Sequence, residues 1–150
     1  MGEGKQRRGL WQNFLHFGNR LRSLLPVTKP LALVASERTI PGSQLLLKLN
    51  ELGYRTEHVN ELGRMIQVVE YMKPLVILID LKWKTRDPFL TINSLVSNKH
   101  TEHTPILAYA PMDEEDQLEK ALNMGASIVS ADNLVLRQLP LLLDQALELD

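Results

Sequence analysis

Hydrophobic residues follow two different periods along this chain. Short apolar runs predict strands, which lie at residues 31–35, 54–59, 75–79, 106–110 and 128–130. Elsewhere apolar residues recur every three or four positions and predict helices, which lie at residues 44–52, 62–72, 89–98, 114–124 and 134–149. Strands that alternate with helices are typical of a parallel sheet, because each parallel crossover needs an intervening element. The pattern therefore predicts an α/β fold, with a five-stranded parallel sheet between two helix layers.

The first 28 residues have a pattern of their own. Their apolar residues fall on one stripe of a helix, which consists of Leu10, Phe14, Phe17, Leu21 and Leu24. Basic residues flank the stripe, and Pro26 ends it. We predict a basic amphipathic helix and linker over residues 1–28, followed by a domain over residues 29–150.

Three roles are open to this N-terminal helix. It could pack on its own domain, pair with another chain in a homo-oligomer, or lie on an anionic membrane surface with Trp11, Phe14 and Phe17 buried. Its stripe, which includes Leu21, is too apolar to remain in water. We expect it to be buried against another protein chain, in a self-associated form or a larger signalling complex.

Composition narrows the classes of function. A chain of 150 residues with 44% hydrophobic residues forms one ordinary domain with a short appendage. Cys is absent, which excludes a disulfide framework, a thiolate zinc site and a cysteine nucleophile. The net charge of -1 provides no general attraction for nucleic acid, so no nucleic-acid partner is expected. No apolar run approaches the roughly 18 to 20 residues that span a bilayer, and a cytoplasmic protein is expected.

Asp80 directly follows the apolar run at residues 75–79. Open α/β sheets place their chemistry at the carboxyl ends of the strands, and here the loops after the first and fifth strands add Ser36, Glu37 and Asp132. Carboxylates at this edge could hold Mg²⁺, with Glu37 and Asp80 as candidate ligands, or could repel one another so that one has a raised pKa. Alternatively, Asp80 accepts backbone N–H groups of the loop that follows it.

The order and spacing of several segments resemble the receiver (CheY-like) domains of two-component response regulators. The resemblance covers roughly residues 29–149, and its main segments are Lys29–Ala35, Lys73–Leu81, Thr101–Ala110 and Asp113–Ala126. It implies a flavodoxin-like (CheY-like) three-layer sandwich with strand order 2-1-3-4-5. It also implies that Asp80 is the phosphoacceptor, and that the partner is a histidine kinase or another signalling protein.

Four positions depart from the pocket that the resemblance implies. Ser36 stands where one of two acidic residues normally helps to hold Mg²⁺, and Ala110 stands where a Ser or Thr hydroxyl binds the phosphoryl group. Val129 replaces an aromatic switch residue, and Asp132 replaces the Lys that pairs with the phosphoaspartate. A phosphoryl group adds about -1.5 to -2 charges, which Asp132 would repel.

These departures predict a degenerate receiver, or pseudoreceiver, that signals through protein–protein interaction. We expect no enzymatic turnover and no cofactor, with at most weak Mg²⁺ binding. The alternative is a functional phosphorelay receiver that a histidine kinase phosphorylates on Asp80. A nucleotide-binding or hydrolytic role is disfavoured, because the loop after the first strand contains only one glycine, Gly42.

Three residues just past Asp80 carry further hypotheses. Lys82 is expected to approach the acidic residues and to replace the missing Lys; Lys84 is a second candidate. Trp83 is a candidate partner contact, since Trp is enriched at interface hot spots, or else it folds back onto the core.

Overall fold

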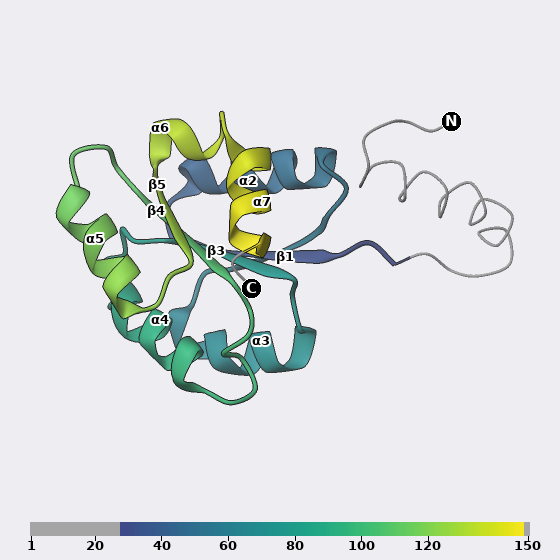
Figure 1. Ribbon diagram of the computed structural model, residues 1–150, viewed down its shortest axis with the longest axis horizontal. Coiled ribbons are helices and arrows are strands. Elements are labelled where there is room, and N and C mark those ends of the chain that lie inside the picture. Colours follow the sequence, from purple (N-terminus) through teal and green to yellow (C-terminus); the bar gives the residue numbers. More distant parts are fainter. Residues whose placement is uncertain (1–27, 149–150) are drawn as a thin grey trace, which may run out of the picture.

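The computed structural model describes residues 28–148, which form a parallel sheet. Its strands are β1 (Leu31–Ala35), β2 (Arg55–Val59), β3 (Val76–Asp80), β4 (Ile106–Ala110) and β5 (Ile128–Ala131). They lie in the order β2-β1-β3-β4-β5, and every neighbouring pair is parallel (Figure 1). The predicted fold class and strand order are confirmed.

Helices connect the strands and cover both faces of the sheet. They are α2 (Thr39–Glu51), the 3-10 turn η1 (Leu62–Arg64), α3 (Met65–Met72), α4 (Pro88–Ser97), α5 (Glu115–Met124), α6 (Asp132–Val135) and α7 (Leu139–Glu148). Helices α2 and α7 lie on one face, and α3, α4 and α5 lie on the other (Figure 1). The result is the expected three-layer sandwich.

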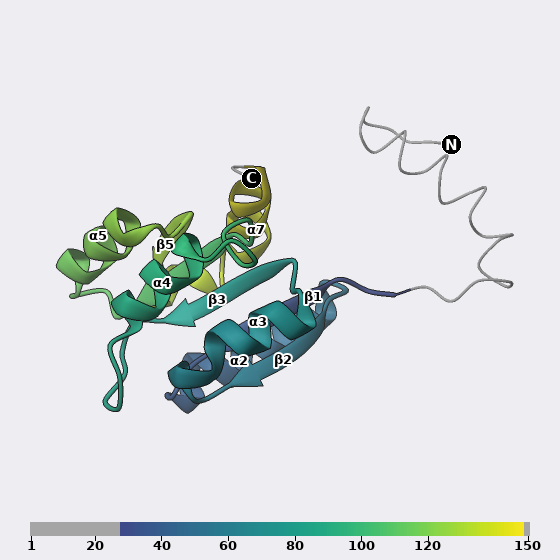
Figure 2. The same ribbon diagram turned by 90° about the horizontal axis from the view of Figure 1, so that it is seen from below.

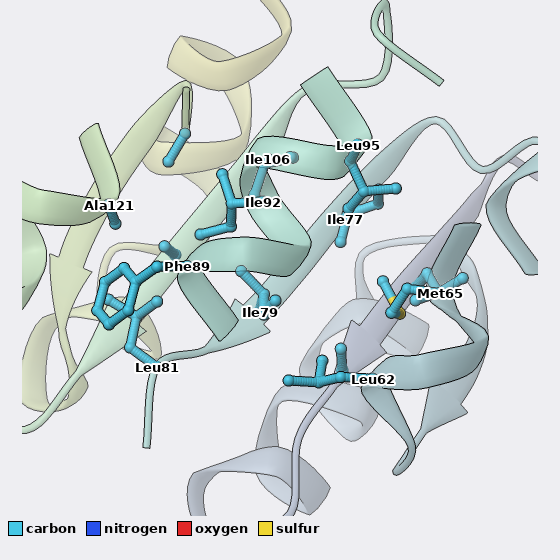
Figure 3. Packing of buried hydrophobic residues seen from close by; sticks show 14 of the residues in the cluster. Leu62, Met65, Ile77, Ile79, Leu81, Phe89, Ile92, Leu95, Ile106 and Ala121 are labelled. Carbon is cyan, nitrogen blue, oxygen red and sulfur yellow. The ribbon is translucent and has the colours of Figure 1, made fainter. Parts of the chain in front are cut away.

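The central strands β1, β3 and β4 are buried along their whole length, so their alternate residues fill two separate cores. Ile77 and Ile79 of β3 pack with Ile92 of α4 in one core (Figure 3). Val76 and Leu78 of β3 pack in the other core, under α2 and α7. Asp80 follows Leu78 by two residues and therefore lies on the α2 and α7 face of the sheet.

Two predicted helices are broken in the structure. The helix predicted over residues 62–72 begins with η1 and becomes α-helical at Met65. The helix predicted over residues 134–149 is two helices, α6 and α7, which residues 136–138 separate. Pro140 accounts for the break, because proline is tolerated in the first turn of a helix but not in its interior. Helix α2 also starts earlier than predicted, at Thr39, although Ile40 itself has a non-helical backbone.

The predicted N-terminal helix lies outside the described residues, together with its residues Trp11, Phe14, Phe17 and Leu21. Its structure and role therefore stay predictions. Within residues 28–148, no helix combines the length and apolar character that crossing a membrane requires.

Candidate functional site

Asp80 is the last residue of β3, and its side chain is fully buried. The carboxylate atom Oδ1 accepts a hydrogen bond from the backbone N–H of Lys82 at 2.8 Å. The indole Nε1–H of Trp83 donates to the backbone carbonyl of Asp80 at 2.6 Å. Asp80 thus stabilises the start of the loop that follows it, as the turn-capping interpretation predicts.

Arg38, in the loop between β1 and α2, binds both oxygens of Asp80. Its Nε donates to Oδ2 at 2.8 Å and its Nη2 donates to Oδ1 at 2.9 Å. The same guanidinium reaches Asp132 at the start of α6, with Nη1 to Oδ2 at 2.9 Å and Nη2 to Oδ1 at 3.2 Å. We call these three residues the Arg38 cluster. A planar fork of donors suits two carboxylates at once, so Asp80 and Asp132 share a cation.

Burial and hydrogen bonding act in opposite directions on the pKa values of the Arg38 cluster. Burial raises the pKa of Asp80 above its usual value, although the hydrogen bonds from Arg38 and from Lys82 N–H act in the opposite direction. Burial alone would lower the pKa of Arg38, but the hydrogen bonds to Asp80 and Asp132 outweigh it and raise that pKa. Arg38 is therefore a permanent cation at this edge of the sheet.

The raised pKa of Asp80 gives stability a defined pH dependence. The folded protein binds a proton at Asp80 more tightly than the unfolded chain does, so this contribution to stability is present at low pH and is lost as pH rises through the folded pKa. Relative to Asp80→Asn, the wild-type free energy of unfolding should increase as pH falls from neutral toward the pKa that Asp80 has in the unfolded chain. Urea unfolding of both proteins across this range measures the difference. If the stability of wild type relative to Asp80→Asn instead increased with rising pH, the pKa of Asp80 would not be raised in the folded protein.

Ser36 and Glu37 anchor the same loop to two other segments. The hydroxyl of buried Ser36 lies 3.1 Å from Nε2 of His58 on β2. The carboxylate of Glu37 accepts hydrogen bonds from Lys84 N–H at 2.7 Å and from the Thr85 hydroxyl at 2.8 Å, and these bonds lower the pKa of Glu37. Three consecutive side chains, at positions 36 to 38, therefore hold β2, the loop after β3 and the Arg38 cluster together.

The residues present do not fit Mg²⁺ on Glu37 and Asp80. Both oxygens of Asp80 are bound by the Arg38 guanidinium, and both oxygens of Glu37 are bound by the loop after β3. No group of three or more metal-ligating side chains lies close enough to hold a metal ion in the part of the chain that the structure describes. A metal ion would have to displace the guanidinium of Arg38 before it could bind Asp80.

The other pocket positions have plain structural surroundings. Ala110 is the fully buried last residue of β4, and it provides no hydroxyl. Val129 of β5 is half-buried and packs against the core under α3, α4 and α5. Tyr109, which faces Asp80 across β3 and β4, is fully buried, and its hydroxyl makes no hydrogen bond of ordinary geometry within residues 28–148.

The hypothesis that Lys82 neutralises the acidic residues is wrong. Its Nζ lies 3.4 Å from Glu114, and the guanidinium of Arg38 takes the expected place beside Asp80. Trp83 is half-buried against the core, in agreement with the fold-back alternative. Sequence reasoning missed Arg38, which stands three residues after β1. The available signal was a basic residue in the loop after β1, at the edge of the sheet where Asp80 and Asp132 also lie.

Comparison with known proteins adds a relationship of fold. No protein-family model matches the sequence, and no curated protein matches it. A response regulator from Desulfuromonas acetoxidans has a similar structure, with a TM-score of 0.68 and 16% identity over 80% of this chain and 98% of that one. The signal receiver domain of a signal transduction histidine kinase from Syntrophus aciditrophicus is also similar, with a TM-score of 0.64 and 18% identity. The match covers 77% of this chain and 90% of that one.

A chemotaxis response regulator of Vibrio cholerae has a TM-score of 0.65 and 15% identity over 77% of this chain and 99% of that one. Because these identities are low, the likeness establishes the fold alone. The chain has the fold of receiver domains, as the resemblance in its sequence implies.

Proposed function

We propose that this chain is a signalling module with a receiver fold that acts by binding other proteins, and that its Asp80 is not a working phosphoacceptor. The observation that carries the proposal is the Arg38 cluster. An aspartate that attacks a phosphodonor needs a free carboxylate oxygen, and both oxygens of Asp80 are hydrogen-bonded in a side chain with no exposed surface.

The surroundings of Asp80 also lack support for a phosphorylated state. Ala110 supplies no hydroxyl, and the carboxylate of Asp132 would face an added charge of about -1.5 to -2. The cation that binds Asp80, Arg38, is already shared between the two carboxylates. We infer a module without catalytic turnover, whose partner is another signalling protein.

The proposal predicts that a small phosphodonor leaves the protein unmodified. Full-length protein is incubated with acetyl phosphate and Mg²⁺, and its intact mass is measured beside that of a receiver domain that accepts phosphoryl from this donor. We expect the control to gain one phosphoryl group and this protein to gain none, because the Arg38 cluster blocks both oxygens of Asp80. A stoichiometric, Mg²⁺-dependent gain that Asp80→Asn abolishes would instead establish the phosphorelay alternative.

A further inference from the structure

Strand β2 forms one outer edge of the sheet, and within the described residues its only strand neighbour is β1 (Figure 2). Arg55 N–H donates to Pro30 at 2.8 Å, and the carbonyl of Val59 accepts from Ser36 N–H at 3.0 Å, so both residues direct their peptide groups toward β1. Peptide groups alternate in direction along a strand, which means that Thr56 and His58 direct theirs away from the sheet. The edge therefore presents donors and acceptors that a further strand could pair with.

The sequence of β2 is complementary to itself in one antiparallel register. A twofold axis at Thr56 places Arg55 of one copy opposite Glu57 of the second copy, and the symmetry repeats this pair. The outward peptide groups of Thr56 then meet their own symmetry mates as a hydrogen-bonded pair. Directly opposite side chains of opposite charge stabilise an antiparallel pair, whereas like charges destabilise it.

Neighbouring registers lack this complementarity. An axis at Arg55 would place two arginines opposite each other, and an axis at Glu57 would place two carboxylates opposite each other. The charges at this edge therefore favour the register with its axis at Thr56 over these two neighbours. They also make the second copy of this chain the best-matched occupant, because the same two residues satisfy both halves of the interface.

A surface hollow beside β2 provides room for the side chains of an added strand. Its volume is about 420 Å³, and residues of β2, the following loop and α3 line it. Among them are Glu57, the half-buried Val68 and Tyr71, which is 86% exposed. An arginine from the second copy could place its aliphatic stem over Tyr71 and its guanidinium beside Glu57.

We propose that β2 is the contact edge of a homodimer, in which two copies pair their β2 strands antiparallel about Thr56 and so join their sheets. The contact goes beyond the function proposed above, since it holds whether or not Asp80 accepts a phosphoryl group. It is also a different surface from the N-terminal helix, for which self-association is expected from the sequence.

Charge reversal tests the proposed dimer in the full-length chain. Analytical ultracentrifugation of wild type between about 1 and 100 μM should show a monomer–dimer equilibrium. Glu57→Arg sets arginines opposite each other, and Arg55→Glu sets glutamates opposite each other. We expect each single variant to weaken dimerisation by about tenfold or more, because two attractive pairs become repulsive. An equimolar mixture of the two variants should recover dimers, since it restores both opposite-charge pairs.

A matched control is Glu119→Arg, a charge reversal at an exposed position of α5. It should leave the dissociation constant unchanged, and circular dichroism confirms that each variant is folded. Wild type that stays monomeric throughout would overturn the proposal. A dimer that both single reversals leave intact would overturn it as well, and would assign self-association to another surface.

Discussion

Arg38→Met is expected to lower the free energy of unfolding by about 3 kcal/mol at neutral pH. Methionine keeps most of the side-chain length but removes the guanidinium, so fully buried Asp80 loses its charge partner. Breaking a buried ion pair in this way is strongly destabilising, because one charge remains uncompensated. We place the loss at the low end of what breaking a buried ion pair costs, because the side chains of Arg38 and Asp132 are 27% and 25% exposed. Urea unfolding followed by circular dichroism measures the loss.

Arg64→Met is the matched control for this substitution. Arg64 lies 3.8 Å from Glu61, both side chains are about two-thirds exposed, and an ion pair of this kind contributes at most about 1 kcal/mol. The loss in Arg38→Met should also shrink as pH falls, because Asp80 without its partner has a still higher pKa and takes up a proton in the folded state. Equal losses in the two variants, or a loss independent of pH, would refute the role assigned to the Arg38 cluster.

Gly125→Ala is expected to destabilise the fold by about 3 kcal/mol, from two separate causes. Gly125 ends α5 with a φ of 122°, a conformation that residues with a Cβ atom rarely adopt. An added Cβ atom would also lie 2.8 Å from Cγ2 and 2.9 Å from Cγ1 of Val96 on α4. Valine in a helix is stiff at χ1, so this clash relaxes only through a strained rotamer of Val96 or a movement of α4 or α5. Thermal and urea unfolding measure the change.

Gly53→Ala separates the two causes. Gly53 also has a positive φ, of 97°, but a Cβ atom there would meet no atom within 4 Å. It should show only the backbone penalty, of about 1 to 2 kcal/mol. If the two alanine variants are equally stable, the contact between Gly125 and Val96 does not contribute, and the packing argument fails.

Burial explains why the sequence predicts the sheet so well. β1 lies at the predicted residues 31–35, and β3 differs from its prediction by one residue, because a strand buried on both faces must be apolar throughout. The predicted bounds of the helices are less accurate where a proline changes the backbone locally. Pro140 was a readable signal for the break before α7, and Pro88 begins α4 one residue ahead of the predicted start.

The candidate site was predictable only in part, for a different physical reason. Strand topology determines which strand ends meet, so Asp80 and Asp132 could be placed at one edge from the sequence alone. Topology does not determine where a long, flexible side chain points. Lys82 is closer than Arg38 to Asp80 in sequence, yet its ammonium group contacts Glu114, whereas Arg38 reaches across from another strand end. The residue that neutralises Asp80 could therefore be identified only from the structure.

If the protein is the signalling module proposed above, the hydrogen bonds of Ser36, Glu37 and Arg38 limit how it can carry information. A conventional switch reports the ratio of two conformers, and a covalent mark changes that ratio. Here a rearrangement of the loop after β1 would have to break the hydrogen bonds of its side chains with His58, Thr85, Asp80 and Asp132. For a scaffold held in one conformer, the quantity that varies is the number of molecules bound to a partner. Its signal would then follow synthesis, degradation and local concentration of the protein.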